Sequence, residues 1–135
     1  MVGRSLEIVP QYTGGKHQVA FLIIDGKKCE AGDFMEMLKR KYPRDYKALI
    51  VIMKHLANYG EIQNTEKMKS IAGFEDVWEL KTRKVKPFRV YGFWEKKWGI
   101  FIVTHGSERH KKATKRNAEF EKTQRYKDRW AKEHP

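Results

Sequence analysis

Lysines and arginines recur along three short β-prone segments in the second half of this chain. Side chains alternate along a strand, which puts Lys81 and Arg83 on one side of the first segment. In the same way Arg89 and Tyr91 share one side of the second segment, and Arg109 follows the third. If the three segments are neighbouring strands, these cations form an electropositive groove that suits a nucleic-acid backbone.

Such a groove could cleave RNA without a metal ion. The ribose 2′-hydroxyl is an internal nucleophile, so the protein has to orient it, accept its proton, stabilise the phosphorane and protonate the leaving 5′-oxygen. Guanidinium groups pair with phosphate oxygens, which makes Arg89 and Arg109 the candidates for stabilising the phosphorane. A lysine among other cations has a lowered pKa, so Lys81 is a candidate base. His105 or His110 could serve in either proton transfer.

Further contacts to RNA are predicted for the residues around these candidates: Arg83, Tyr91, His110, Lys111, Lys112 and Lys115. Lys112 is also a candidate for placing the substrate or moving protons. For each single cation the alternative is a solvated surface charge, and His105 could equally be a hydrogen-bonded structural group. Asp76 and Glu79 are interpreted as surface groups, and carboxylates are too few in the basic half for a two-metal nuclease.

The elements that must position these residues are predicted to be strands in an antiparallel meander. The strands span residues 77–83, 88–94 and 99–105, which are rich in β-branched and aromatic residues and separated by short turn-like breaks. Earlier in the chain, the β-prone runs 6–12 and 19–25 predict an N-terminal hairpin, or a loop leading into one strand.

Two consecutive helices are predicted between the hairpin and the meander. Asp33 and Glu36 form a capping-box pattern for a first helix that ends near Lys41. Pro43 cannot continue that helix but suits the first turn of a second, whose apolar stripe ends near Gly60. Together they predict a helical hairpin packed on the sheet.

The remaining segments are more polar. Residues 61–73 are predicted to be a loop with room for one short helical turn, and Ala72-Gly73 is predicted to turn into the first strand of the meander. Residues 114–131 lack Gly and Pro and predict a terminal helix with too few apolar residues for a wide buried face. The expected architecture is therefore α+β.

Length and charge narrow the classes of function. The 135 residues suit a single domain, 1–135, and the one cysteine, Cys29, indicates neither a disulfide framework nor a zinc site. Residues 1–80 carry 12 basic and 11 acidic side chains, whereas residues 81–135 carry 17 and 6. This asymmetry favours nucleic acid, an acidic protein or an anionic membrane surface as partner. No signal peptide or long apolar run is recognisable, so a soluble cytoplasmic protein without a cofactor is expected.

Three sequence patterns of the basic half resemble the RelE/ParE toxin superfamily, and within it the HigB-like toxins and their phage-derived relatives. VWELK at 77–81 resembles the family's first strand, FRVYGF at 88–93 its second, and IVTHG at 102–106 its third. The two preceding helices and the following helix also match, so the likeness covers roughly residues 19–130. Departures from the family pattern are Ser107 in place of an aromatic residue, Ala113-Thr114-Lys115 in place of K-T-P, and a longer leading hairpin.

The resemblance implies a RelE-like fold and the toxin of a type II toxin-antitoxin system. Such a toxin is a ribosome-dependent mRNA endonuclease that needs no metal and is held inactive by a cognate antitoxin. Arg89 corresponds to the family's arginine on the middle strand, Lys81 and Arg83 to basic positions on the preceding strand, and Arg109 to an arginine beyond the last strand. Two alternatives stay open: a toxin of this fold that blocks a protein such as DNA gyrase, and a non-catalytic RNA-binding phage regulatory module.

Overall fold

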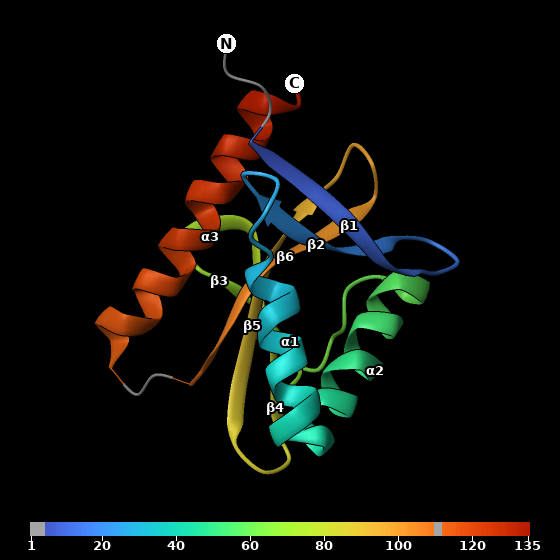
Figure 1. Cartoon of the computed structure of the whole chain (residues 1–135), viewed down its shortest axis with the longest axis vertical. Helices are drawn as coiled ribbons and strands as arrows, with labels where there is room; N and C mark the ends of the chain where they lie inside the picture. The colour runs from blue at the N-terminus through green and yellow to red at the C-terminus, as the bar shows by residue number, and fades with distance from the viewer. Residues whose placement is uncertain (1–4, 110–111) are drawn as a thin grey trace.

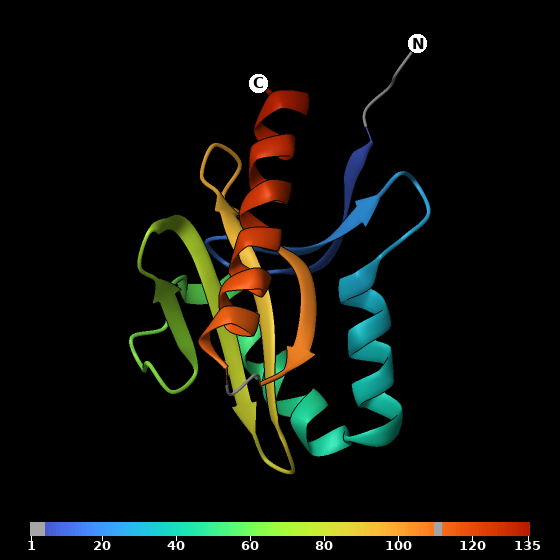
Figure 2. The same cartoon turned by 90° about the vertical axis from the view of Figure 1, so that its left-hand side faces the viewer.

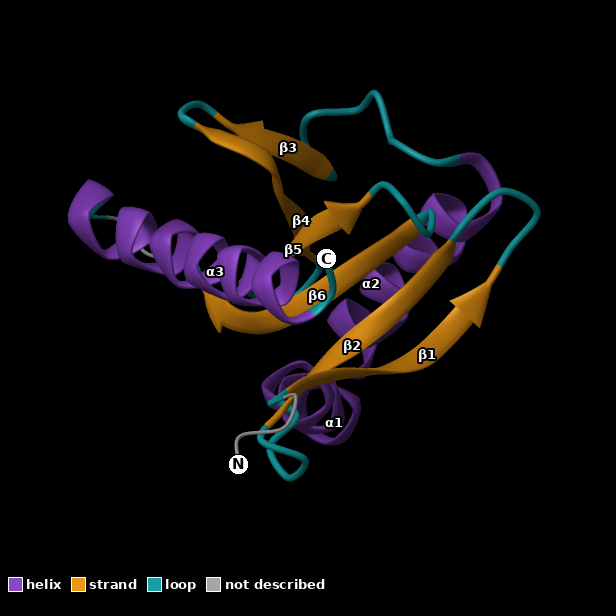
Figure 3. Ribbon diagram, turned by 90° about the horizontal axis from the view of Figure 1, so that it is seen from above, coloured by secondary structure: helices purple, strands orange, loops and turns teal. Residues whose placement is uncertain are grey.

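The structure is a computed structural model that describes residues 5–109 and 112–135. In this part of the chain a six-stranded sheet separates two helices on one face from a third helix on the other (Figures 1 and 3). The elements are β1 (Leu6–Thr13), β2 (Gln18–Ile24), α1 (Glu30–Lys41), α2 (Pro43–Tyr59), β3 (Met68–Ile71), β4 (Phe74–Arg83), β5 (Pro87–Glu95), β6 (Ile100–Glu108) and α3 (Ala113–Glu133). The α+β class predicted from the sequence is confirmed.

The sheet is mixed and larger than the predicted meander. Its strand order is β1-β2-β6-β5-β4-β3, and only β2 and β6 pair in parallel. The three predicted strands are present as β4, β5 and β6, and the N-terminal runs form a hairpin. These three strands form the predicted antiparallel meander, but the prediction was incomplete because β2 and β3 extend the sheet on its two sides. Side-chain periodicity within a strand does not reveal which distant strand lies beside it.

Strand β3 corrects the prediction of a loop over residues 61–73. Met68 is buried and pairs with Leu80 of β4, whereas Lys69 and Ser70 are exposed. With only four residues and one buried side chain, the strand leaves no apolar pattern in the sequence. The predicted turn at Ala72-Gly73 is present, and Gly73 has a φ of 85° that favours glycine.

Helix α1 begins at Glu30, so the predicted capping box at Asp33 and Glu36 was wrong. Its buried residues Ala31, Met35 and Leu38 repeat every three to four positions and set the face that packs on the sheet. For α2 the expectation holds: Pro43 occupies its first turn, and the helix ends at Tyr59, before Gly60. Both helices share one hydrophobic core with the sheet face they cover.

Helix α3 crosses the opposite face of the sheet (Figure 2). It buries Phe120, Thr123 and Trp130, and Trp130 joins a second hydrophobic core with Phe93 and Val77. The few buried positions agree with the sparse apolar pattern of this helix. No helix in the described part of the chain is long and apolar enough to cross a lipid bilayer.

Candidate functional site

Four of the predicted cations meet at one end of the sheet. Lys81 of β4 is directly opposite Arg89 of β5, and Arg83 is opposite Pro87. The backbone N–H of Arg109 donates to the carbonyl of Pro87 at 2.8 Å, which fixes Arg109 beside the start of β5. Strand register and one backbone hydrogen bond therefore bring together residues that are up to 28 positions apart in the sequence.

These four cations line a groove of 710 Å³ along β4. We call it the basic groove. Its other lining residues are Glu66, Lys67, Thr82 and Lys84, and Ala48, Val51 and Ile52 of α2. The groove is beside the part of β4 that extends past its pairing with β3, and the N–H of Lys81 donates there to the carbonyl of Lys67, the residue before β3, at 2.8 Å. It thus combines a cationic wall with a short apolar wall.

Glu79 is the carboxylate that balances the buried part of this charge. Its Oε1 atom is 3.8 Å from Nε of Arg89 and 3.9 Å from Nζ of Lys81. Glu79 is only 8% exposed and Arg89 only 9%. The interpretation of Glu79 as a surface group was therefore wrong. Strand alternation puts Glu79 on the same side of the sheet as Lys81, where it is buried and paired with Lys81 and Arg89.

Burial and like charges shift the pKa values of two groove residues. Burial lowers the pKa of the Lys81 ammonium; Glu79 opposes this shift, while the charges of Arg89 and Arg109 add to it. Burial also lowers the pKa of the Arg89 guanidinium; Glu79 again opposes the shift, and Arg109 adds to it. The direction for Lys81 agrees with the sequence prediction, and it increases the fraction of this amine that is neutral and therefore able to accept a proton.

A buried carboxylate on α2 holds the tip of the β4–β5 hairpin in place. Asp45 is 0% exposed and accepts hydrogen bonds from the hydroxyl of Thr82 at 3.0 Å and from three backbone N–H groups. These are the N–H groups of Lys84, Val85 and Lys86, at 2.7, 3.0 and 3.2 Å. Burial alone raises the pKa of Asp45, but these donors lower it by more, so the net shift is downward. The hairpin is thereby fixed to α2.

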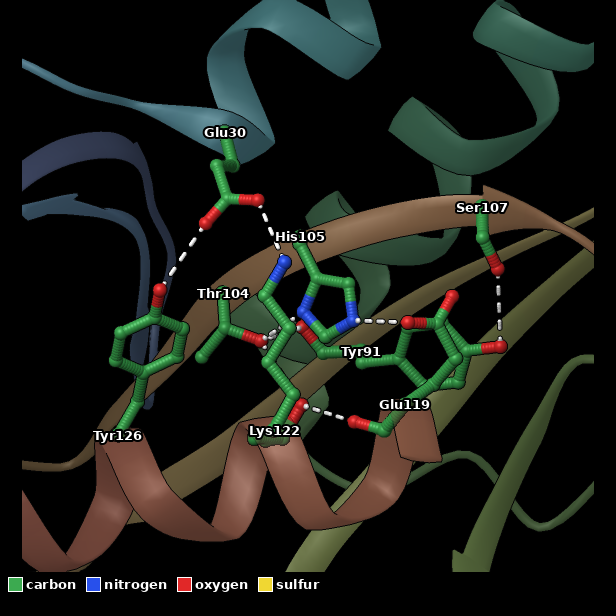
Figure 4. Close-up of polar contacts among 9 residues, drawn as sticks. Glu30, Tyr91, Thr104, His105, Ser107, Glu119, Lys122 and Tyr126 are labelled. Atoms are coloured by element: carbon green, nitrogen blue, oxygen red, sulfur yellow. Dashed lines mark hydrogen bonds and ion pairs between the residues drawn. The ribbon is translucent and has the colours of Figure 1, made fainter. Parts of the chain in front are cut away.

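His105 and Tyr91 belong to a separate polar cluster beneath α3, which we call the His105 cluster (Figure 4). His105 is 3% exposed and stacks on Tyr91, with ring centroids 4.9 Å apart. Its Nδ1 hydrogen bonds with Oγ1 of Thr104 at 2.9 Å, and its Nε2 with Oε1 of Glu119 at 3.3 Å. The cluster also includes two more hydroxyl groups. That of Ser107 hydrogen bonds with the hydroxyl of Tyr91, and that of Thr123 with the hydroxyl of Thr104. Both ring nitrogens of His105 are therefore already hydrogen bonded.

Tyr91 has almost no surface for the RNA contact that the sequence predicted. It is 1% exposed, and its hydroxyl hydrogen bonds with that of Ser107 at 3.2 Å. Burial raises its pKa to about 12, so the phenol stays protonated at neutral pH. Neither Tyr91 nor His105 lines the basic groove.

The other predicted contacts are at the start of α3 or beyond the described residues. Lys112 and Lys115 are exposed and do not line the basic groove. His110 and Lys111 lie outside the residues that the structure describes. Across 5–109 and 112–135, no group of three or more His, Cys, Asp and Glu side chains is arranged to hold a metal ion.

Sequence reasoning missed four residues that shape the groove: Asp45, Lys67, Glu79 and Lys84. The alternation Val77, Glu79, Lys81 was a usable signal for Glu79. No sequence signal exists for Asp45, because its partners are 37 to 41 positions away. No protein-family model, curated protein or solved structure matches this chain.

Proposed function

We propose that this chain is a RelE/HigB-like toxin that cleaves mRNA on the ribosome. The observation that supports the proposal best is the basic groove itself, which Lys81, Arg83, Arg89 and Arg109 all line. A groove with this charge is complementary to the phosphates of a nucleic acid. In the toxin family named above, cations at the matching strand positions bind and cleave mRNA.

In the proposed reaction the 2′-oxygen attacks the adjacent phosphorus and the bond to the 5′-oxygen breaks. The products are a 2′,3′-cyclic phosphate and a free 5′-hydroxyl. Arg89 and Arg109 stabilise the charge of the phosphorane, because guanidinium groups donate to two phosphate oxygens at once. Lys81, whose pKa is lowered, takes the proton of the 2′-hydroxyl as a neutral amine, and the leaving 5′-oxygen receives a proton from water.

Lys81 is a better candidate for proton transfer than His105. The histidine lies beneath α3 with both ring nitrogens hydrogen bonded, whereas Lys81 lines the groove. Arg83 and Lys112 then serve to place the substrate. The proposal includes a cognate antitoxin that covers the groove and a site of action in the cytoplasm.

The test is to express the chain in bacteria and map the 5′ ends of transcripts. Cleavage within translated messages is expected for the parent protein, and none for an Arg89→Ala, Arg109→Ala double variant. Lys97→Ala, in the exposed turn between β5 and β6, is the matched control and should cleave like the parent. Intact messages together with DNA damage would instead indicate a toxin that acts on DNA gyrase.

A second candidate is a non-catalytic RNA-binding module. The observation that favours it is the pairing of Glu79 with both Arg89 and Lys81, since Glu79 favours the charged form of Lys81 and so opposes the lowering of its pKa. In this case overexpression causes no growth defect. Arg89→Ala then weakens RNA binding to all sequences alike. It also reduces the dependence of binding affinity on salt concentration by the amount expected for about one lost phosphate contact.

A further inference from the structure

We propose that the apolar wall of the basic groove, formed by Ala48, Val51 and Ile52 of α2, contacts an unstacked nucleobase of single-stranded RNA. Val51 would then be the residue that determines sequence preference. This inference rests on the proposed function for the identity of the ligand. The cationic wall supplies affinity for phosphate, and the α2 wall supplies contact with the base.

The geometry of α2 places these three side chains on one side of the helix. Ala48 is three positions before Val51 and four before Ile52, a spacing that puts side chains on the same helical face. Ile52 is buried in the core, but Val51 is 63% exposed. An exposed large apolar side chain that lines a cationic groove can bury its apolar surface against a bound ligand.

The charges of the cationic wall identify an anion as the other part of the ligand. Among the described residues, no carboxylate lies within 4.0 Å of the charged nitrogens of Lys67, Arg83, Lys84 or Arg109. Glu66 is the one acidic side chain among the described residues that line the groove. The groove is therefore complementary to a group that is anionic on one side and apolar on the other, as a nucleotide is.

The size of the apolar wall distinguishes a nucleotide from larger ligands. Three residues within about one helical turn are too short for an amphipathic helix, which needs anchors at positions i, i+4 and i+7. In a duplex the bases are stacked inside, so the wall would meet sugar and phosphate only. An unstacked base offers an apolar face that packs on Val51 while its phosphate binds the cations, since both line the same groove around the end of β4.

Recognition by this wall would act through size and contact area. Side chains of Ala, Val and Ile have no hydrogen-bonding groups, so they cannot read the edge of a base. The wall should therefore distinguish large from small bases and should not depend on a specific donor or acceptor.

Binding of purified protein to fluorescently labelled RNA tests the inference. Three probes share one length: a single strand, the same strand in a duplex, and a strand with abasic sites. We expect Val51→Ser to weaken binding of the single strand about five-fold, by removing roughly one buried side chain's contact. Binding of the abasic strand should not change.

Val85→Ser is the matched control, because it makes the same change at an apolar residue that is 55% exposed but does not line the groove. It should leave binding of every probe unchanged. Equal losses for the single strand and the abasic strand would overturn the inference, as would no loss at all.

The inference and the proposed function fail in different ways. If Val51→Ser selectively weakens single-strand binding but the parent cuts no message, the wall contacts bases and the nuclease proposal is wrong. If the parent cuts messages and Val51→Ser leaves the distribution of cut sites unchanged, the nuclease proposal holds and the role of Val51 is overturned.

Discussion

The basic groove and the His105 cluster share strands and contain neighbouring residues. Their polar side chains differ in whether they have hydrogen-bond or ion-pair partners. Arg89 and Tyr91 are two positions apart on β5, on the same face of the sheet. In the His105 cluster every polar group of the histidine has a partner, and α3 covers it. In the groove, cations outnumber carboxylates among the lining residues, and only Lys81 and Arg89 of the four predicted cations have a carboxylate partner among the described residues. An excess of unpaired charge marks a binding site, whereas a saturated network marks a structural one.

The largest effect that would test this contrast is the loss of Arg89. In ribosome cleavage assays Arg89→Ala should reduce the single-turnover rate about 100- to 1,000-fold, as removal of a transition-state donor does in other enzymes. Its free energy of unfolding should also fall, by about 1–3 kcal/mol, because the buried Glu79 loses one of its two cationic partners. A variant that unfolds but cleaves normally per folded molecule would reverse the roles assigned to the two regions.

The matching change in the His105 cluster should affect stability rather than chemistry. His105→Ala removes a stacked ring and two hydrogen bonds from the interior, which should cost about 2–4 kcal/mol. Urea unfolding measures this cost. The folded fraction should cleave within a few-fold of the parent rate, and a loss comparable to that of Arg89→Ala would place His105 in the reaction.

A third prediction concerns Asp45, which holds the hairpin that forms one side of the groove. Its pKa is lowered in the folded protein, so its contribution to stability is complete above the ordinary value of 3.8. The contribution is lost as the pH falls through the lower, folded value. Asp45→Asn should therefore destabilise the protein by about 1–3 kcal/mol at neutral pH.

The difference between Asp45→Asn and the parent should shrink as the pH falls below 3.8. Urea unfolding at neutral and acidic pH measures it. Glu36→Gln, at an exposed position of α1, is the control and should change stability by less than about 0.5 kcal/mol. An Asp45→Asn deficit that stays constant with pH would show that the carboxylate charge is not what holds the hairpin.

The smallest effect is expected at the boundary of the two regions. Tyr91→Phe removes only the hydrogen bond to Ser107 and should cost about 0.5–1.5 kcal/mol. Cleavage should be unchanged, since the hydroxyl does not line the groove. A slower cleavage rate with unchanged stability would extend the site from Arg89 to Tyr91.

Much of the candidate site followed from local patterns. Period-two alternation placed Lys81, Arg83 and Arg89 on one face of adjoining strands, and the structure brings them together. The same alternation placed Tyr91 with Arg89 but contained no information about what covers each residue. Helix α3 covers Tyr91 and leaves Arg89 at the edge of the groove, so equivalent positions on one strand differ in exposure to ligand.

The sequence by itself determined the strands and helices of the basic half and the charge that gathers there, because these depend on neighbours a few positions away. Only the tertiary structure decided that β2 lies beside β6, that Asp45 fixes the hairpin, and that α2 and the cations line the same groove. Each of these depends on contacts between residues far apart in the chain. Such contacts form when separate elements bury their apolar faces together, and a single element's pattern does not specify its partner.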